Sequence, residues 1–332
     1  MGKYKILSGV AMLLVAAIGW GGMFPVAKAA LPAIDAFYLA TIRYGVTALV
    51  FVALLARTEG VAALGFDGKG VRLALLGAAG FAGFGILAFL GLAHSRPEHG
   101  AIIMATQPLV AALVVWATRG TRPALATFAS IVVAFAGVLL VITRGHLAGV
   151  FAGGTAFGDL LMFFAAICWV VYTLGAAGFA GWSPLHYTTV TCTLGVLAIW
   201  VVTSVATLTG FGHAPEAAAL RSVAWQMVYI IAIASVLGVL AWNIGNQALG
   251  SANGVLFINF VPITAFAIEI AQGHRFETVE LVGAAMVIGA LVANTLMLKA
   301  ARPAPFAAPA SAPPLRVAAP GALPRPLCEV PH

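Results

Sequence analysis

Long runs of apolar residues dominate the chain, and they do not alternate in polarity as a half-buried strand would. A helix needs about 20 apolar residues to cross a bilayer core about 30 Å thick. Because hydrocarbon offers no hydrogen-bond partners, each segment must bond its own backbone groups, as a helix does. The pattern therefore predicts an all-α integral membrane protein with ten transmembrane helices, at residues 6–27, 37–56, 73–93, 99–117, 125–143, 159–180, 186–209, 224–247, 254–272 and 280–299.

The composition agrees with this interpretation, because only 8% of the residues are charged while 62% are hydrophobic. A soluble domain carries roughly 25% charged residues, so we exclude an ordinary soluble globular protein. The 17 basic residues are scattered singly and form no basic face, which argues against nucleic acid as a partner. The lipid bilayer is the predicted surrounding. Residues 300–332, rich in Pro and Ala, are predicted to be a disordered cytosolic tail.

The distribution of Lys and Arg predicts how the chain is oriented in the membrane. With a cytoplasmic N-terminus, eleven of the 17 basic residues fall on the cytoplasmic side, five on the opposite side, and Arg43 within the second span. Cytoplasmic loops carry the excess of Lys and Arg, so we predict a multi-pass protein of the cytoplasmic (inner) membrane with both termini inside. Lys3, Lys5 and residues 27–29 (AKA) also resemble a signal peptide, but the apolar run between them is long enough to span.

The sequence repeats itself at a nearly constant offset. Residues 16–20 (AAIGW) recur as residues 165–169 (AAICW), an offset of 149. Residues 85–89 (GILAF) recur as residues 238–242 (GVLAW), an offset of 153. A fixed offset of this kind indicates a duplicated structural unit.

The repeat divides the chain into two halves that hold five spans each. Residues 1–152 contain spans one to five, residues 153–299 contain spans six to ten, and Pro108 matches Pro262 at an offset of 154. Because five is odd, the second half must cross the membrane in the opposite direction. Inverted repeats are typical of secondary transporters, which bind their substrate near the midplane between the two halves.

Several motifs also resemble a known family. Residues 20–28 (WGGMFPVAK) and 40–44 (ATIRY) resemble the opening of EamA-type carriers of the drug/metabolite transporter (DMT) superfamily. The ninth span with Pro262 and the stretch from Gly283 to Gly289 resemble their close. The resemblance covers roughly residues 6–299. It implies ten helices in two inverted halves, alternating access, and export of an amino acid or a related metabolite.

The chain departs from the family pattern in one respect. Family members usually have a Gly-Glu pair after the fourth and ninth spans, whereas this chain has Gly120-Thr121 and Gly273-His274. Any role of those glutamates is therefore not carried over. A carrier of another solute class, such as a nucleoside, a quaternary amine or a drug-like cation, stays an alternative.

Two charged side chains fall inside apolar spans, where a charge costs about 2.5–3.5 kcal/mol on insertion scales. Arg43 lies in the second span, and we interpret it either as a group that attracts a substrate carboxylate or phosphate, or as a structural arginine that snorkels outward or pairs with Glu269. Glu269 in the ninth span is the candidate for proton coupling, with an ion pair or an interfacial position as the alternatives.

Aromatic residues recur at related positions of the two halves. Trp20 and Trp169 match across the repeat, and Tyr172 follows Trp169 by three residues on one helical face. Met23 in the first span and Trp242 in the eighth complete the group. We predict that these side chains bind substrate as an apolar wall or a cation–π face, with helix packing as the alternative.

Amide side chains are concentrated in the eighth and ninth spans. Asn243, Asn246 and Gln247 share one helical face, and Asn259 follows in the ninth span. Gln107, in the fourth span, belongs to the same set. Buried amides must find hydrogen-bond partners, so we predict a polar substrate path here. Hydrogen bonding between helices is the alternative.

The remaining polar residues give no sign of an enzyme. HExxH, GxSxG and paired catalytic aspartates do not occur, so we predict neither catalysis nor a metal or other cofactor. A charge ring or carbonyl filter typical of a channel is also missing, while a structural membrane scaffold stays an alternative. Six residues at span ends are expected to be solvated boundary charges or to belong to a wet external mouth: Lys28, His94, Glu98, His99, Asp159 and Glu280.

Overall fold

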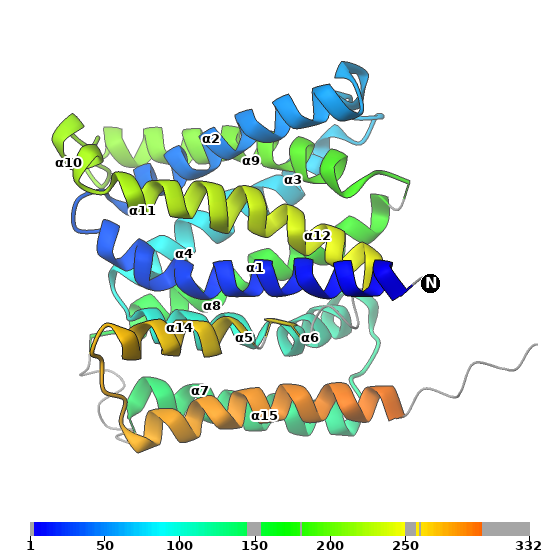
Figure 1. The fold of residues 1–332 in the computed structure, drawn as a ribbon, viewed down its shortest axis with the longest axis vertical. Coiled ribbons are helices and arrows are strands. Elements are labelled where there is room, and N and C mark those ends of the chain that lie inside the picture. The colour runs from blue at the N-terminus through cyan, green and yellow to red at the C-terminus, as the bar shows by residue number, and fades with distance from the viewer. Residues whose placement is uncertain (1–2, 145–153, 180, 250–256, 259, 301–332) are drawn as a thin grey trace, which may run out of the picture.

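Helices connected by turns make up the computed structural model, which describes residues 3–144, 154–179, 181–249, 257–258 and 260–300 and contains no strand within them. The helices run side by side, parallel or antiparallel, in one bundle (Figure 1). The first part of the chain forms α1 (Lys3–Ala30), α2 (Ala36–Thr58), η1 (Val61–Leu64), α3 (Gly70–Gly77), η2 (Ala78–Gly83), α4 (Phe84–Ala93), α5 (Pro97–Ala105), α6 (Gln107–Arg119) and α7 (Leu125–Thr143). The second part forms α8 (Ala156–Gly175), η4 (Ala176–Phe179), α9 (Pro184–Leu208), α10 (Ala217–Ser222), α11 (Ala224–Val228), η5 (Tyr229–Leu237), α12 (Gly238–Leu249), α14 (Phe260–Ala271) and α15 (Thr278–Ala300).

Polar residues at the helix ends explain several of these boundaries. The Asp35 carboxylate accepts a hydrogen bond from the Tyr38 backbone N–H and caps the start of α2. Ser183 does the same for His186 at the start of α9, where Pro184 occupies the first helical position. At the other end of a helix, Gly120 takes the left-handed conformation that terminates α6.

Seven helices of the described chain are long and apolar enough to cross a membrane, which agrees with an integral membrane protein. The fourth predicted span consists of two helices, and the described parts of the ninth and tenth are shorter apolar helices, Phe260–Ala271 and Thr278–Asn294. An all-helical membrane protein is thus confirmed, while the count of ten spans in two repeats stays a prediction.

The fourth span was predicted as one helix over residues 99–117, and this is wrong in one respect. α5 and α6 meet at an angle of 48° around Thr106. Pro108 explains the break, because proline lacks an N–H and its ring clashes with the preceding turn of a continuous helix.

Two spans contain π-helical turns, which the sequence did not predict. They are η2, between α3 and α4, and η5, between α11 and α12. A π-helical turn displaces backbone carbonyls from the usual ladder and often occurs at functional sites.

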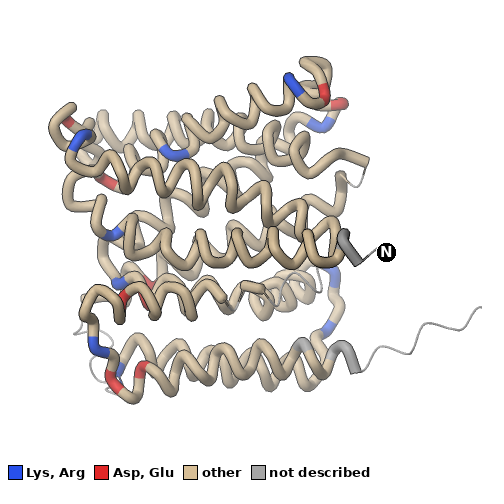
Figure 2. Tube along the Cα trace, viewed as in Figure 1, with Lys and Arg blue, Asp and Glu red and all other residues tan. Residues whose placement is uncertain are grey.

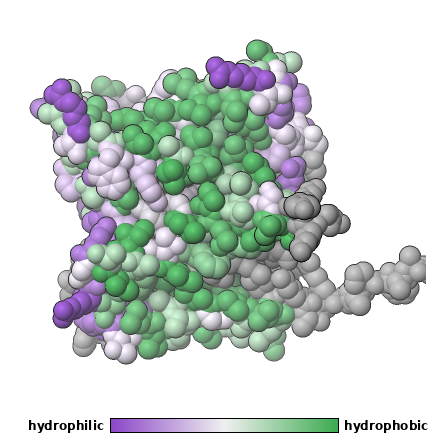
Figure 3. All heavy atoms as spheres, viewed as in Figure 1, coloured by the Kyte–Doolittle hydropathy of each residue, from purple (hydrophilic) through white to green (hydrophobic). Residues whose placement is uncertain are grey.

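The bundle has two ends, which we call the Lys3 end, where α1 begins, and the Ala30 end, where α1 finishes. Charged residues gather toward both ends, and the middle is nearly free of them (Figure 2). A broad apolar band covers the visible face between the ends (Figure 3). This distribution is that expected of a bundle surrounded by lipid.

Buried polar contacts hold the Ala30 end together, so the expectation of solvated charges there is wrong. Asp159 is 5% exposed, and Glu280, Glu98 and His99 are at most 1% exposed. Only His94 of this group is exposed. The reason is that the turn between α4 and α5 folds onto the starts of α8 and α15.

Lys28 and Glu280 each join several segments at this end. The Lys28 ammonium is half-buried and donates hydrogen bonds to the carbonyl oxygens of Leu92, Ala93 and Ser95, at 2.8, 3.1 and 2.7 Å. The Glu280 carboxylate accepts from Arg96 at 3.3 Å and from Arg144 at 2.9 Å. Lys28 thereby connects α1 to α4 and the turn after it, and Glu280 connects α15 to the start of α5 and the end of α7.

Glycines allow close helix contacts at the same end. A Cβ atom added to Gly158 of α8 would lie 2.4 Å from the carbonyl oxygen of Gly91 in α4, and one added to Gly91 would lie 2.6 Å from that of Gly158. The two backbones therefore touch directly. Because Asp159 also binds the turn after α4, α8 starts at the Ala30 end and runs antiparallel to α1.

Candidate functional site

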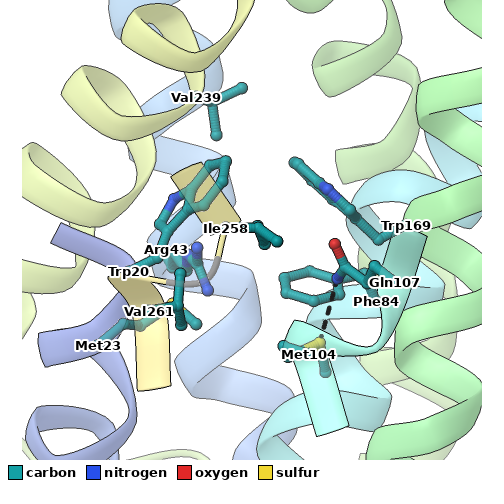
Figure 4. Close-up of a pocket in the computed structure, with 10 residues that line it drawn as sticks. All are labelled: Trp20, Met23, Arg43, Phe84, Met104, Gln107, Trp169, Val239, Ile258 and Val261. Carbon is teal, nitrogen blue, oxygen red and sulfur yellow. Dashed lines mark hydrogen bonds between the residues drawn. The ribbon is translucent and has the colours of Figure 1, made fainter. Parts of the chain in front are cut away.

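A cavity lies in the centre of the bundle, between helices from both parts of the chain (Figure 4). Its free volume is about 30 Å³, enough for about two water molecules at roughly 10–15 Å³ each. The lining is apolar except for one amide and one guanidinium group. It consists of Trp20, Met23, Arg43, Phe84, Met104, Gln107, Trp169, Val239, Ile258 and Val261.

Aromatic rings form two walls of this cavity. The ring centres of Trp20 and Trp169 are 5.8 Å apart in an edge-to-face arrangement. The Trp242 ring centre lies 5.2 Å from that of Trp20, and the Phe84 ring centre lies 5.1 Å from that of Trp169. The Trp20 indole N–H donates to the carbonyl oxygen of Ala234, at 2.8 Å, within the π-helical segment η5. This bond fixes the ring that faces the cavity.

Arg43 is the charged residue of the lining. Its side chain is 2% exposed, Nε donates to the Ser235 hydroxyl at 2.6 Å, and the guanidinium carbon lies 4.6 Å from the Tyr44 ring centre. Nη1 is buried and has no hydrogen-bond partner in the part of the chain that the structure describes. Among the described residues Arg43 forms no ion pair with Glu269. The snorkelling and the ion-pair interpretations are therefore both wrong.

The cavity continues toward the Lys3 end and widens as it goes. Gln107, Trp169 and Ile258 also line a second cavity of about 130 Å³. That cavity shares Thr173, Leu174 and Trp242 with a third one of about 560 Å³, where Asn243, Asn246, Gln247, Arg119, Trp182 and Tyr187 contribute to the wall. We call these three connected spaces the funnel.

Most of the predicted site residues meet in the funnel. Trp20, Met23, Arg43, Gln107 and Trp169 surround its narrow part, and Trp242, Asn243 and Asn246 surround its wide part. The Asn243 amide donates to the Thr188 hydroxyl at 2.7 Å, and the Gln107 amide contacts the Met104 sulfur at 3.3 Å. Asn246 Oδ1 is buried without a partner and adds an acceptor to the funnel wall.

Three predicted residues lie elsewhere. The Tyr172 ring packs beside Trp169 and against Gly80 of η2, and it lines none of the funnel cavities. Glu269 is half-buried near the Ala30 end of α14, outside the funnel lining. Asn259 lies outside the described residues. Proton coupling by Glu269 stays a prediction.

Sequence reasoning missed several lining residues. Phe84, Met104, Val239, Ile258 and Val261 were not singled out, because apolar residues in an apolar chain carry no distinguishing signal. For two of them the position in the sequence could have indicated a place in the site. Met104 lies three residues before Gln107, and Phe84 directly precedes the repeated segment at residues 85–89. Within the described residues no group of three or more His, Cys, Asp or Glu side chains is arranged to hold a metal ion.

Comparisons with known proteins show which family this chain is similar to. The model of the EamA-like transporter family matches residues 7–143 and 156–296. The transporter YrdR of Bacillus subtilis, itself uncharacterized, is 34% identical over 300 residues, which cover 89% of this chain and 94% of that protein. The uncharacterized transporter YyaM of the same organism is 32% identical over 294 residues, covering 87% and 94%. A solved crystal structure aligns with a TM-score of 0.63 at 19% identity, covering 90% of this chain and 99% of that one, and so has the same fold.

Proposed function

The chain belongs to the EamA-like transporter family, and from this premise we propose that it exports a small metabolite, an amino acid or a derivative of one, by alternating access. It is a multi-pass membrane protein of a transporter family rather than an enzyme family. In this proposal it lies in the cytoplasmic membrane with both termini inside, so the Lys3 end faces the cytoplasm and the Ala30 end faces out.

The funnel is the observation that carries the proposal. It is wide at the Lys3 end, narrows between Trp20 and Trp169, and stops before the packed Ala30 end. A carrier that loads its solute from the cytoplasm requires an opening on that side and a closed opposite side. At about 30 Å³ the narrow part is too small for an amino acid, so binding must move its walls apart.

Three features support two inverted five-helix repeats, residues 1–152 and 153–299. Residues 78–83 of η2, shifted by 153, fall inside η5 (Tyr229–Leu237), so the π-helical turns correspond. By the repeat offsets, α8 is the counterpart of α1 and α12 is the counterpart of α4. α1 packs on α12, and correspondingly α8 packs on α4. α8, the counterpart of α1, runs in the opposite direction. Inverted halves of this kind permit a rocking motion about a central site.

The lining points to a solute with a carboxylate and an apolar part. Arg43 offers a buried guanidinium whose Nη1 has no partner, and a carboxylate binds such a group with charge-assisted hydrogen bonds. Among the described residues that line the three funnel cavities, none is acidic. The tryptophan rings favour a quaternary amine as the second candidate, through cation–π contacts. Arg43 opposes that candidate by charge repulsion.

Counterflow in proteoliposomes tests the proposal. Vesicles loaded with unlabelled solute are mixed with labelled alanine, leucine, phenylalanine, thymidine or choline. We expect exchange of at least one amino acid, and a Trp20→Ala variant that exchanges it at least about tenfold more slowly. The solute loses the apolar wall that the Trp20 ring forms, and burying an apolar group contributes about 1.5–3 kcal/mol. Trp200→Ala is the control, because that indole is 52% exposed on the bundle surface. Exchange of choline alone would select the second candidate, and no exchange of any solute would refute transport.

A further inference from the structure

Three buried polar side chains meet at the Ala30 end, outside the funnel. Ser95 donates to Oδ1 of Asp159, and Nδ1 of His99 lies 3.1 Å from the same oxygen and 3.3 Å from Oδ2. Ser95, His99 and Asp159 are 3%, 1% and 5% exposed. A carboxylate and an imidazole in mutual contact share one hydrogen bond, and the imidazole has a second ring nitrogen that is free of that bond.

The geometry fixes where a proton can be added. Because the ionised Asp159 carboxylate only accepts hydrogen bonds, Nδ1 of His99 must carry the hydrogen between them. That leaves Nε2 with its lone pair, buried and without a hydrogen-bond partner among the described residues. Protonation of Nε2 converts the pair from a net negative charge to a neutral imidazolium–carboxylate pair, which is bonded more strongly.

The charged neighbours of this pair are engaged with other groups. Lys28 from α1 donates to the carbonyl oxygens of Leu92 and Ala93 at the end of α4 and of Ser95 in the turn that follows. Arg96 lies 3.5 Å from Glu98 and 3.3 Å from Glu280, and Arg144 from α7 also binds Glu280. The other titratable groups at this end are His94 on the exposed turn, Glu269 on α14, and His274, Arg275 and Glu277 in the turn before α15. Glu277 lies 3.7 Å from Arg144.

The pair connects the two parts of the chain through helices that line the funnel. His99 is on α5, and Met104 lies five residues further along, about 7.5 Å away at 1.5 Å per residue. Asp159 is on α8, and Trp169 lies ten residues further along, about 15 Å away. A change in the bond between His99 and Asp159 therefore acts on two helices, α5 and α8, that both contribute residues to the lining of the narrow cavity.

We propose that His99 and Asp159 form a proton-binding site that couples proton entry to solute export. A proton that binds Nε2 from the outer side strengthens the pair and holds the Ala30 end closed, which returns the carrier to the state open at the Lys3 end. While the carrier is open at the Lys3 end, the proton leaves Nε2 for the cytoplasm, and the loaded carrier then opens outward with Nε2 unprotonated. This inference rests on the proposed function, because it requires a carrier that alternates between the two ends.

The experiment uses the full-length protein in proteoliposomes and tritiated leucine as the probe. One measurement is counterflow at equal pH, and the other is uptake against a concentration gradient when the vesicle interior is one pH unit more acidic than the medium. We expect the wild type to accumulate leucine at least about fivefold in the second measurement, since one pH unit corresponds to a tenfold driving force. His99→Gln should keep counterflow within about twofold and lose the accumulation.

Three further variants make the result specific. Asp159→Asn should behave as His99→Gln does and provides the second test if that variant does not fold. His94→Gln, which changes an exposed histidine five residues away, should behave as the wild type. Glu269→Gln tests the coupling residue predicted from the sequence, because accumulation lost in that variant and kept in His99→Gln would assign the coupling to Glu269. Accumulation retained by both His99→Gln and Asp159→Asn, or lost only in Glu269→Gln, would overturn the proton site. A wild type that exchanges leucine in counterflow but does not accumulate it under the pH gradient would overturn the proton site alone. The absence of counterflow for every solute of the panel would refute the proposed function.

Discussion

Arg43→Ala is expected to lower leucine counterflow about 10- to 100-fold while the folded yield is preserved. The guanidinium is buried at the narrow part of the funnel, and Nη1 has no partner there. A hydrogen bond to a charged group contributes about 1.5–3 kcal/mol, and each 1.4 kcal/mol corresponds to a factor of about ten in affinity. Initial rates at leucine concentrations well below saturation measure this loss directly.

A matched control and a matched solute separate binding from folding. Arg57→Ala removes an arginine from the exposed end of the same helix, α2, and should exchange leucine as the wild type does. Leucinamide lacks the carboxylate, so its exchange should differ little between the wild type and Arg43→Ala. A collapse of folded yield in Arg43→Ala, or an equal loss for leucine and leucinamide, would instead assign Arg43 a structural role through Ser235.

The helices themselves were predictable because hydrophobic length is a local property of the sequence. The predicted spans at residues 37–56 and 125–143 coincide with α2 and α7 to within two residues. Trp20 and Trp169 were found because the repeat brought them into correspondence, and they line the narrow cavity together with Arg43. These signals depend on residue type and spacing alone.

The remaining features depend on contacts that spacing does not reveal. His99 and Asp159 are 60 residues apart, and each lies near a span end, where hydropathy places a residue in water. Their burial arises from the fold of the turn between α4 and α5 over α8. The π-helical turns η2 and η5 were missed for a related reason, since they carry ordinary apolar sequences, AAGFAG and YIIAIASVL.

Gly158→Ala is expected to reduce the folded fraction strongly, because α8 and α4 touch there through their backbones. The added Cβ would lie 2.4 Å from the Gly91 carbonyl oxygen and 2.8 Å from the His94 carbonyl carbon, and backbone atoms cannot move aside as a flexible side chain can. Overpacking costs about 1–3 kcal/mol, occasionally more, and the displaced helix start also carries Asp159. The unfolding midpoint and the monodisperse fraction in detergent measure the effect.

Substitutions at two further glycines are expected to change the stability less than Gly158→Ala does. Gly9→Ala should destabilise less than Gly158→Ala, because its Cβ meets only side-chain atoms, Ala248 Cβ at 2.9 Å and Leu249 Cγ at 3.0 Å. A Cβ atom added to Gly45 in α2 would have no atom within 4 Å. Gly45→Ala should therefore leave the free energy of unfolding unchanged or raise it by up to about 1 kcal/mol, as expected for alanine in a helix interior. If Gly158→Ala were as stable as Gly45→Ala, α4 and α8 would not be in backbone contact. The Ala30 end would then lack the packing that closes the funnel on that side.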